Sequence, residues 1–169
     1  MSSLDPLIAG IDFGRVGRAA ARFSEHELQA LNVRVLHALP WQAVQSPARA
    51  NDPRIDNALW QVAHGNIERL EDLRQWLTVA HGPLEPSIDP AERDFLTQAA
   101  HALPEEPWNH TIWSSWTKAL AGTSDRKGRA LFLPLRRALT AADHGPEMAG
   151  MLPLIGRVRV LARLQGSAA

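Results

Sequence analysis

The sequence predicts an all-α protein, and three observations support this fold class. Apolar residues recur three and four positions apart along most of the chain, as on the buried face of a helix. Residues that start helices, such as Ser and Asp, and residues that end them, Gly and Pro, stand between these runs. Alternating patterns rich in β-branched residues, which are typical of strands, are almost absent. With 169 residues and 45% apolar content, the chain can bury the core of one domain or of two small helical parts.

The first half of the chain is expected to form three helices. A capping box opens the first, which spans residues 24–39 and stops at a proline. Asp52 and Pro53 form an N-cap and first-turn pair that is expected to open the second, which ends near Gly65. An apolar stripe predicts the third over residues 67–81.

The second half begins with a proline-rich link at residues 83–90. We expect a helix from Asp89 to about Leu103, and another from an Asn109 cap to Gly122. Ser124 or Asp125 can cap the basic segment that follows, where Pro134 predicts a kink or a late start. A short helix should follow Gly145, and Pro153 should begin the last one.

Composition excludes several classes of function. The absence of cysteine removes disulfides, thiolate metal sites and cysteine nucleophiles, and the seven histidines lack the spacing of a helical zinc site. Without an apolar run of roughly 20 residues or an apolar stretch behind a basic amino terminus, neither a membrane partner nor a secretory signal is expected. The protein is therefore expected to be cytoplasmic.

Charge is distributed unevenly along the chain. Residues 126–169 carry eight basic and two acidic side chains, a net charge of +6, whereas the first 125 residues carry −6. Such a chain could hold a polyanion at its basic end, but a solvated arginine-rich helix face explains the charge equally well.

The aromatic and acidic residues favour structural roles. Four of the six tryptophans, Trp60, Trp76, Trp113 and Trp116, lie on apolar helix stripes and are expected in the core rather than stacked on bases, whereas Trp41 and Trp108 near prolines should be more open. Neighbouring carboxylates do not face each other on a helix, so solvation explains them better than acid-base catalysis. His64 and His81 precede glycines at helix ends, where capping is the expected role.

One region points to a nucleic acid. Arg126, Lys127 and Arg129 stand at the start of the basic helix, and a Gly145-Pro146 corner follows its end. Basic residues near a helix start can hold phosphates while a rigid turn presents backbone groups to exposed bases. Single-stranded loops are where RNA sequence is read, because their base edges are accessible.

The same region carries a resemblance to a known family. The runs KGRALFLPLRRALT (residues 127–140), DHGPEM (143–148) and PLIG (153–156) closely resemble the end of proteobacterial glutamyl-tRNA synthetases. Further blocks upstream fall in the family's order, at residues 21–32, 36–40, 65–70 and 81–86. The resemblance covers nearly the whole chain and implies the all-helical, two-part cage of the class I anticodon-binding type.

The resemblance implies three regions and a set of RNA contacts. Residues 1–30 would be the tail of a region that contacts the tRNA stem, 31–80 the first anticodon subdomain and 81–169 the second. Arg136 would contact the anticodon strand, and Asn66 stands where some relatives place an arginine that selects the first anticodon base. The turn of His144, Gly145 and Pro146, with Met148, would pack against the third base.

Two departures from the family have physical consequences. An asparagine at position 66 offers one neutral donor and acceptor in place of a charged fork, which predicts relaxed reading of glutamate and glutamine tRNAs. Relatives commonly have glycine where this chain has Ala141, whose backbone is less free.

The resemblance also implies what the chain lacks. The ATP-binding signatures of class I synthetases, of the HIGH and KMSKS types, are absent. ATP and magnesium would belong to a catalytic domain, so this chain, with no cofactor of its own, is not expected to activate glutamate. The expected partner is tRNA and not DNA, and the alternative is a free-standing helical adaptor for another RNA or a protein.

Overall fold

A computed structural model describes residues 24–169, and every regular element in this part is helical. Residues 1–30 were expected to be the tail of a stem-contact region. Of these, residues 1–23 lie outside the part of the chain that the structure describes. None of the helices described is long and apolar enough to cross a membrane.

Four α-helices form one end of the molecule and its centre: α2 (Glu25–Ala38), α3 (Trp41–Asn51), α4 (Asn57–Ala63) and α5 (Leu73–His81). Two 3₁₀ turns, His64–Asn66 and Leu70–Asp72, lie between α4 and α5. The predicted first helix is confirmed, since Ser24 Oγ accepts from Glu27 N at 3.4 Å. The predicted third helix is also present and ends at Gly82, with φ 68°, but α5 begins at Leu73 after the 3₁₀ turn rather than at residue 67.

Helix α3 was not predicted, and it corrects two expectations. This helix is hard to predict because prolines usually interrupt helices: Pro40 is its N-cap and Pro47 lies inside it. Asp52 follows α3 instead of opening the next helix, and its carboxylate pairs with Arg54 at 2.8 Å. The N-cap of α4 is Asp56, whose Oδ1 accepts from Leu59 N at 2.9 Å.

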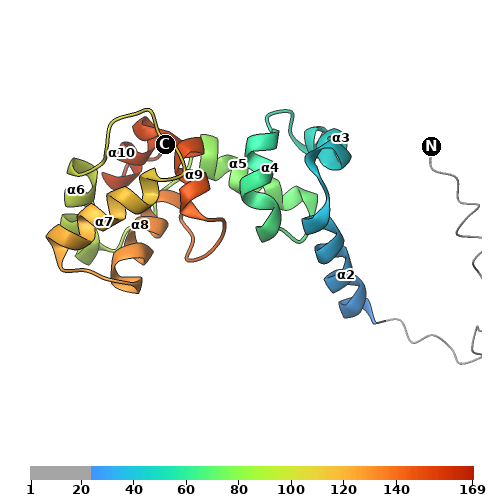
Figure 1. The fold of residues 1–169 in the computed structure, drawn as a ribbon, viewed down its shortest axis with the longest axis horizontal. Coiled ribbons are helices and arrows are strands. Elements are labelled where there is room, and N and C mark those ends of the chain that lie inside the picture. Colours follow the sequence, from blue (N-terminus) through green and yellow to red (C-terminus); the bar gives the residue numbers. More distant parts are fainter. Residues whose placement is uncertain (1–23) are drawn as a thin grey trace, which may run out of the picture.

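The other end of the molecule contains the 3₁₀ turn Pro90–Glu92 and five α-helices: α6 (Arg93–His101), α7 (Ile112–Ser124), α8 (Arg129–Thr140), α9 (Met148–Ile155) and α10 (Arg157–Leu164). Helix α10 packs on α6, α8 and α9, while α9 also packs on α4, α5 and α7. Helices α5 and α9 therefore join the two ends of the molecule (Figure 1).

Four helix boundaries in this part differ from expectation. The N-cap of α7 is Thr111 rather than Asn109, whose Oδ1 accepts from Thr111 N at 2.8 Å. Gly122 lies inside α7, which continues to Ser124 and ends at Asp125 in the left-handed region. The N-cap of α8 is Gly128, with φ 54°, rather than Ser124 or Asp125. Pro153 lies inside α9, and it is Gly156, with φ 78°, that separates α9 from α10.

Pro134 is accommodated inside α8 with a local compensation. A proline cannot donate to the carbonyl four residues earlier, which here belongs to Ala130. Arg126 Nη1 donates to that carbonyl oxygen at 3.2 Å. The same guanidinium pairs with Glu92 and lies 4.3 Å from the centre of the Phe95 ring.

The tryptophans account for much of the core. Trp60, Trp76 and Trp116 are 1–5% exposed, as predicted, and Trp116 Nε1 donates to Ala99 O at 3.1 Å. Trp113 is half-buried. Trp41, which was expected to be open, is only 7% exposed because it belongs to the unpredicted helix α3.

One buried cation links the parts of the fold. Arg163 on α10 has no exposed surface and donates to Val79 O at 2.7 Å, Leu139 O at 2.8 Å and Ala169 O at 2.7 and 3.0 Å. Val79 and Leu139 lie in the last turns of α5 and α8, where carbonyl groups have no partner within their own helix. Burial lowers the pKa of Arg163 to about 10.

Candidate nucleic-acid interface

A hollow of about 480 Å³ brings together segments that are far apart in the sequence. One wall is the turn after α8, and the other is formed by the 3₁₀ turn His64–Asn66, which follows α4, and by α5. The residues that line it are Asn66, Gln75, Trp76, Ala142, Asp143, His144 and Gly145. Three of the residues singled out in the sequence, Asn66, His144 and Gly145, therefore lie around one cavity.

The turn begins at a strained residue. Ala141 is the C-cap of α8 and has φ 54° and ψ 18°, the left-handed region in which glycine is preferred. The Ala141 amide donates to Arg137 O at 2.9 Å, and Thr140 Oγ1 accepts from Ala142 N at 3.3 Å. The chain therefore turns sharply at the end of α8. Ala141 adopts the backbone conformation that a glycine at this position would adopt without strain.

Gly145 allows the turn to pack directly against the core. Its φ is 142°, and a Cβ atom at this position would lie 2.2 Å from Cη2 of Trp76. Any side chain here would overlap the buried indole, so a glycine is needed for the close approach. The turn rests directly on Trp76, whose ring also forms part of the cavity wall.

An ion pair fixes the middle of the turn. Arg137 Nε and Nη2 donate to the two carboxylate oxygens of Asp143 at 2.5 and 2.8 Å. These hydrogen bonds hold the pKa of Asp143 below its ordinary value and raise that of Arg137. With side chains 41% and 46% exposed, the pair is screened by solvent and adds little to global stability, so its effect is chiefly local.

Arg136 supports the turn from beneath. Its half-buried guanidinium donates to Pro146 O at 3.1 Å, and burial lowers its pKa. Pro146 is buried and Met148 is only 2% exposed, so neither offers an exposed side chain on which a base could pack.

The three basic residues at the start of α8 have different surroundings. Lys127 and Arg129 are exposed, and neither side chain forms a hydrogen bond or ion pair within residues 24–169. Arg126 is instead held by Glu92 and by the Ala130 carbonyl. An α-helix rises about 1.5 Å per residue, so Arg129 lies roughly 16 Å along α8 from Thr140, the residue after which the turn begins.

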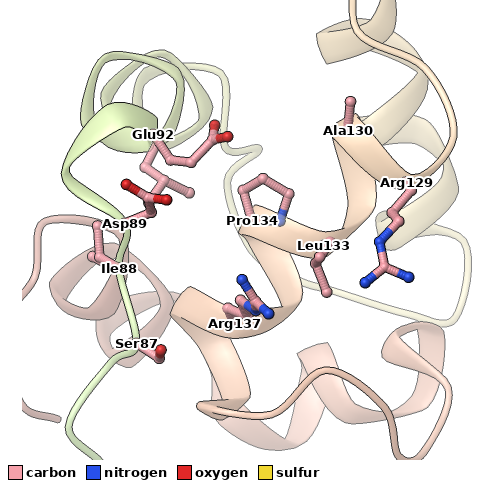
Figure 2. A pocket seen from close by; sticks show the side chains of 10 residues that line it. Ser87, Ile88, Asp89, Glu92, Arg129, Ala130, Leu133, Pro134 and Arg137 are labelled. Carbon is pink, nitrogen blue, oxygen red and sulfur yellow. The ribbon is translucent and has the colours of Figure 1, made fainter.

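A second hollow, of about 380 Å³, lies between α8 and the segment that precedes α6. Figure 2 shows Pro134 at its centre, with Asp89 and Glu92 on one side and Arg137 below. Asp89 and Glu92 face Arg129 and Arg137 across it, so its charges balance and a phosphate gains less there than at a surface that carries only cations. Arg137 lines this hollow while its partner Asp143 lines the first, so the ion pair lies between the two.

Two residues of the first cavity, Gln75 and Trp76, were not predicted as site residues from the sequence. Trp76 was correctly placed in the core, but nothing in the sequence showed that Gly145 would leave its ring at the cavity wall. Gln75 is an exposed residue next to it, with no motif to mark it. In residues 24–169, no group of three or more His, Asp or Glu side chains is arranged to hold a metal ion.

Known proteins resemble this chain along its whole length. It is 44% identical to glutamate–tRNA ligase 1 of Rhodospirillum rubrum over 169 residues, which cover 100% of the chain and 37% of that protein. It is 43% identical to glutamate–tRNA ligase 2 of Acidiphilium cryptum over 166 residues, covering 98% of the chain and 37% of that protein. The chain thus spans little more than a third of the length of these relatives.

A solved structure shows the same fold. The crystal structure of a glutamate tRNA ligase from Elizabethkingia meningosepticum superposes with a TM-score of 0.80 at 17% identity, covering 96% of this chain and 36% of the other. This likeness confirms the predicted all-helical fold of the anticodon-binding type. The family model described as "Anticodon binding domain" matches residues 34–168. The chain therefore belongs to the anticodon-binding domain family found in glutamate–tRNA ligases.

Proposed function

We propose that this chain binds the anticodon loop of glutamate tRNA as the RNA-reading part of a glutamate–tRNA ligase. The observation that carries the proposal is the cavity in which Asn66 faces the rigid turn of residues 142–145. A splayed base can enter such a cavity, where amide and backbone groups are available to its edge. The family match and the relatives support this function and give the adaptor alternative no support.

Lys127 and Arg129 are proposed to hold phosphates of the strand that enters the cavity. Both are exposed cations at the start of α8, where the helix dipole also favours an anion. Arg136 would act mainly through the turn, because its guanidinium already bonds the Pro146 carbonyl.

Binding of an anticodon stem-loop RNA at several salt concentrations tests this proposal. Affinity should fall steeply with salt, and Lys127→Ala or Arg129→Ala should each lower the log–log slope by roughly 0.7 to 1. Arg34→Ala is the matched control, because Arg34 is an exposed arginine on α2, at the other end of the molecule (Figure 1). Salt-independent binding, or slopes unchanged in both variants, would count against the proposal.

We further propose that the module accepts both glutamate and glutamine tRNAs, because the neutral amide of Asn66 discriminates less than a guanidinium. Competition between the two anticodon stem-loops should show similar affinities. A strong preference for one of them would refute relaxed reading while leaving anticodon binding intact.

The chemistry of the whole enzyme is proposed to lie outside this chain. The ATP and magnesium sites would belong to a catalytic domain, and the module would act in the cytoplasm, where tRNAs are charged. An ATP–pyrophosphate exchange assay on this chain alone should show no activity, and measurable exchange would overturn this division of labour.

A further inference from the structure

The two walls of the cavity differ in how their polar groups are engaged. On the turn side, the Asp143 carboxylate is held by Arg137 and the Ala142 amide by Thr140, while the exposed His144 side chain forms no hydrogen bond with any described residue. On the opposite side, the side-chain amides of Asn66 and Gln75 are exposed and form no hydrogen bond with any described residue. The backbone of the turn is therefore fixed, whereas the two amides on the opposite side are free to adjust.

A free amide is an unusually adaptable partner for a base. It carries one acceptor and one two-proton donor, and a half-turn about its last bond exchanges their positions. A guanidinium could only donate and a carboxylate could only accept. Two free amides that line one cavity can thus match base edges that present donors and acceptors in different orders.

We infer that Gln75 is a specificity-determining residue, which with Asn66 forms an adaptable amide pair that lets one cavity accept bases with different Watson–Crick edges. Cytosine presents an amino donor at the position where guanine and uracil present a carbonyl acceptor. The fixed turn and the Trp76 ring limit how large a base can be and how deeply it can enter the cavity. The amide pair accepts bases whose donors and acceptors are arranged differently. This inference rests on the proposed anticodon binding and extends it to a residue that the resemblance did not indicate.

Substitutions that fix the hydrogen-bonding character of position 75 test the inference. Gln75→Arg leaves donors only, and Gln75→Glu leaves acceptors only, on an exposed residue that should not disturb the fold. Affinities are measured for stem-loop RNAs carrying each of the four bases at each anticodon position. At one position, the arginine variant should shift the guanine-to-cytosine affinity ratio roughly tenfold upwards, and the glutamate variant should shift it downwards by a similar factor.

The affinity ratio, rather than affinity itself, is the informative quantity, because the added charge changes binding of every RNA. Gln42→Arg and Gln42→Glu are matched controls, since Gln42 is an exposed glutamine on α3 that does not line the cavity. They should change all affinities together and leave the ratio within twofold.

The outcomes separate this inference from the function on which it rests. If the unmodified protein binds no stem-loop, the proposed function fails and the inference fails with it. If it binds in a salt-dependent manner but both Gln75 variants keep its base preferences within twofold, only the inference is refuted. Opposite shifts in the two variants, absent from the Gln42 pair, would establish the role of Gln75.

Discussion

Replacing Gly145 by alanine should destabilise the protein and displace the wall of the cavity. The new Cβ would lie 2.2, 2.9 and 3.0 Å from three atoms of the Trp76 ring, which is only 5% exposed and packed in the core. A φ of 142° is also unfavourable for a residue with a side chain. Backbone strain and overpacking each cost about 1–3 kcal/mol, and because one shift of the turn would relieve both, we expect a net loss of about 3 kcal/mol.

Urea denaturation measures this loss as a lower midpoint with an unchanged slope. The control is Gly122→Ala, since Gly122 lies inside α7 and a Cβ atom at this position would meet no other atom within 4 Å. That variant should gain about 0.5–1 kcal/mol, because alanine is the better helix former. If Gly145→Ala stays within about 0.5 kcal/mol of the unmodified protein, the turn does not rest on Trp76 and the reasoning is wrong.

Three further predictions concern single residues. Ala141→Gly should raise the free energy of unfolding by about 1 kcal/mol by relieving the left-handed strain, and no gain in thermal or urea denaturation would contradict the turn geometry. Arg163→Met should lower it by about 3–5 kcal/mol, because buried carbonyl groups lose a charged donor, and a loss under 1 kcal/mol in the same assay would contradict the buried network. The pKa of Asp143 should lie below its ordinary value of about 3.9, so the pair with Arg137 contributes above that pH and is lost as the pH falls through the lowered pKa. A carboxyl NMR titration checks this, and Arg137→Gln should return the pKa of Asp143 towards its ordinary value.

The fold class was predictable because helix signals act locally. Ser24 caps α2 and Gly82 ends α5 as expected, since the side chain or the backbone freedom required is visible in the residue itself. Two of the failures occur where a proline is tolerated by tertiary packing. Pro47 sits inside α3 and Pro153 inside α9, each in a helix that covers buried residues, and burial outweighs the lost hydrogen bond.

The site was predictable only in part. The resemblance supplied Asn66 and His144, and the structure places both at one cavity. Gln75 and the ion pair of Arg137 with Asp143 could not be inferred, because their roles depend on how the turn after α8 meets α5. Such a meeting is a property of long-range packing, which no local pattern in the sequence encodes.

The position of Arg163 determines how this protein can be divided. A cut in the proline-rich link would leave α5 in one fragment and Arg163, with α8, in the other. The second fragment would then have to bury a cation that had lost one of its carbonyl partners, and the first would expose the end of α5. Neither piece is therefore a sound candidate for an independently folding RNA reader, and a transplantable module should carry both helical parts in one uninterrupted chain.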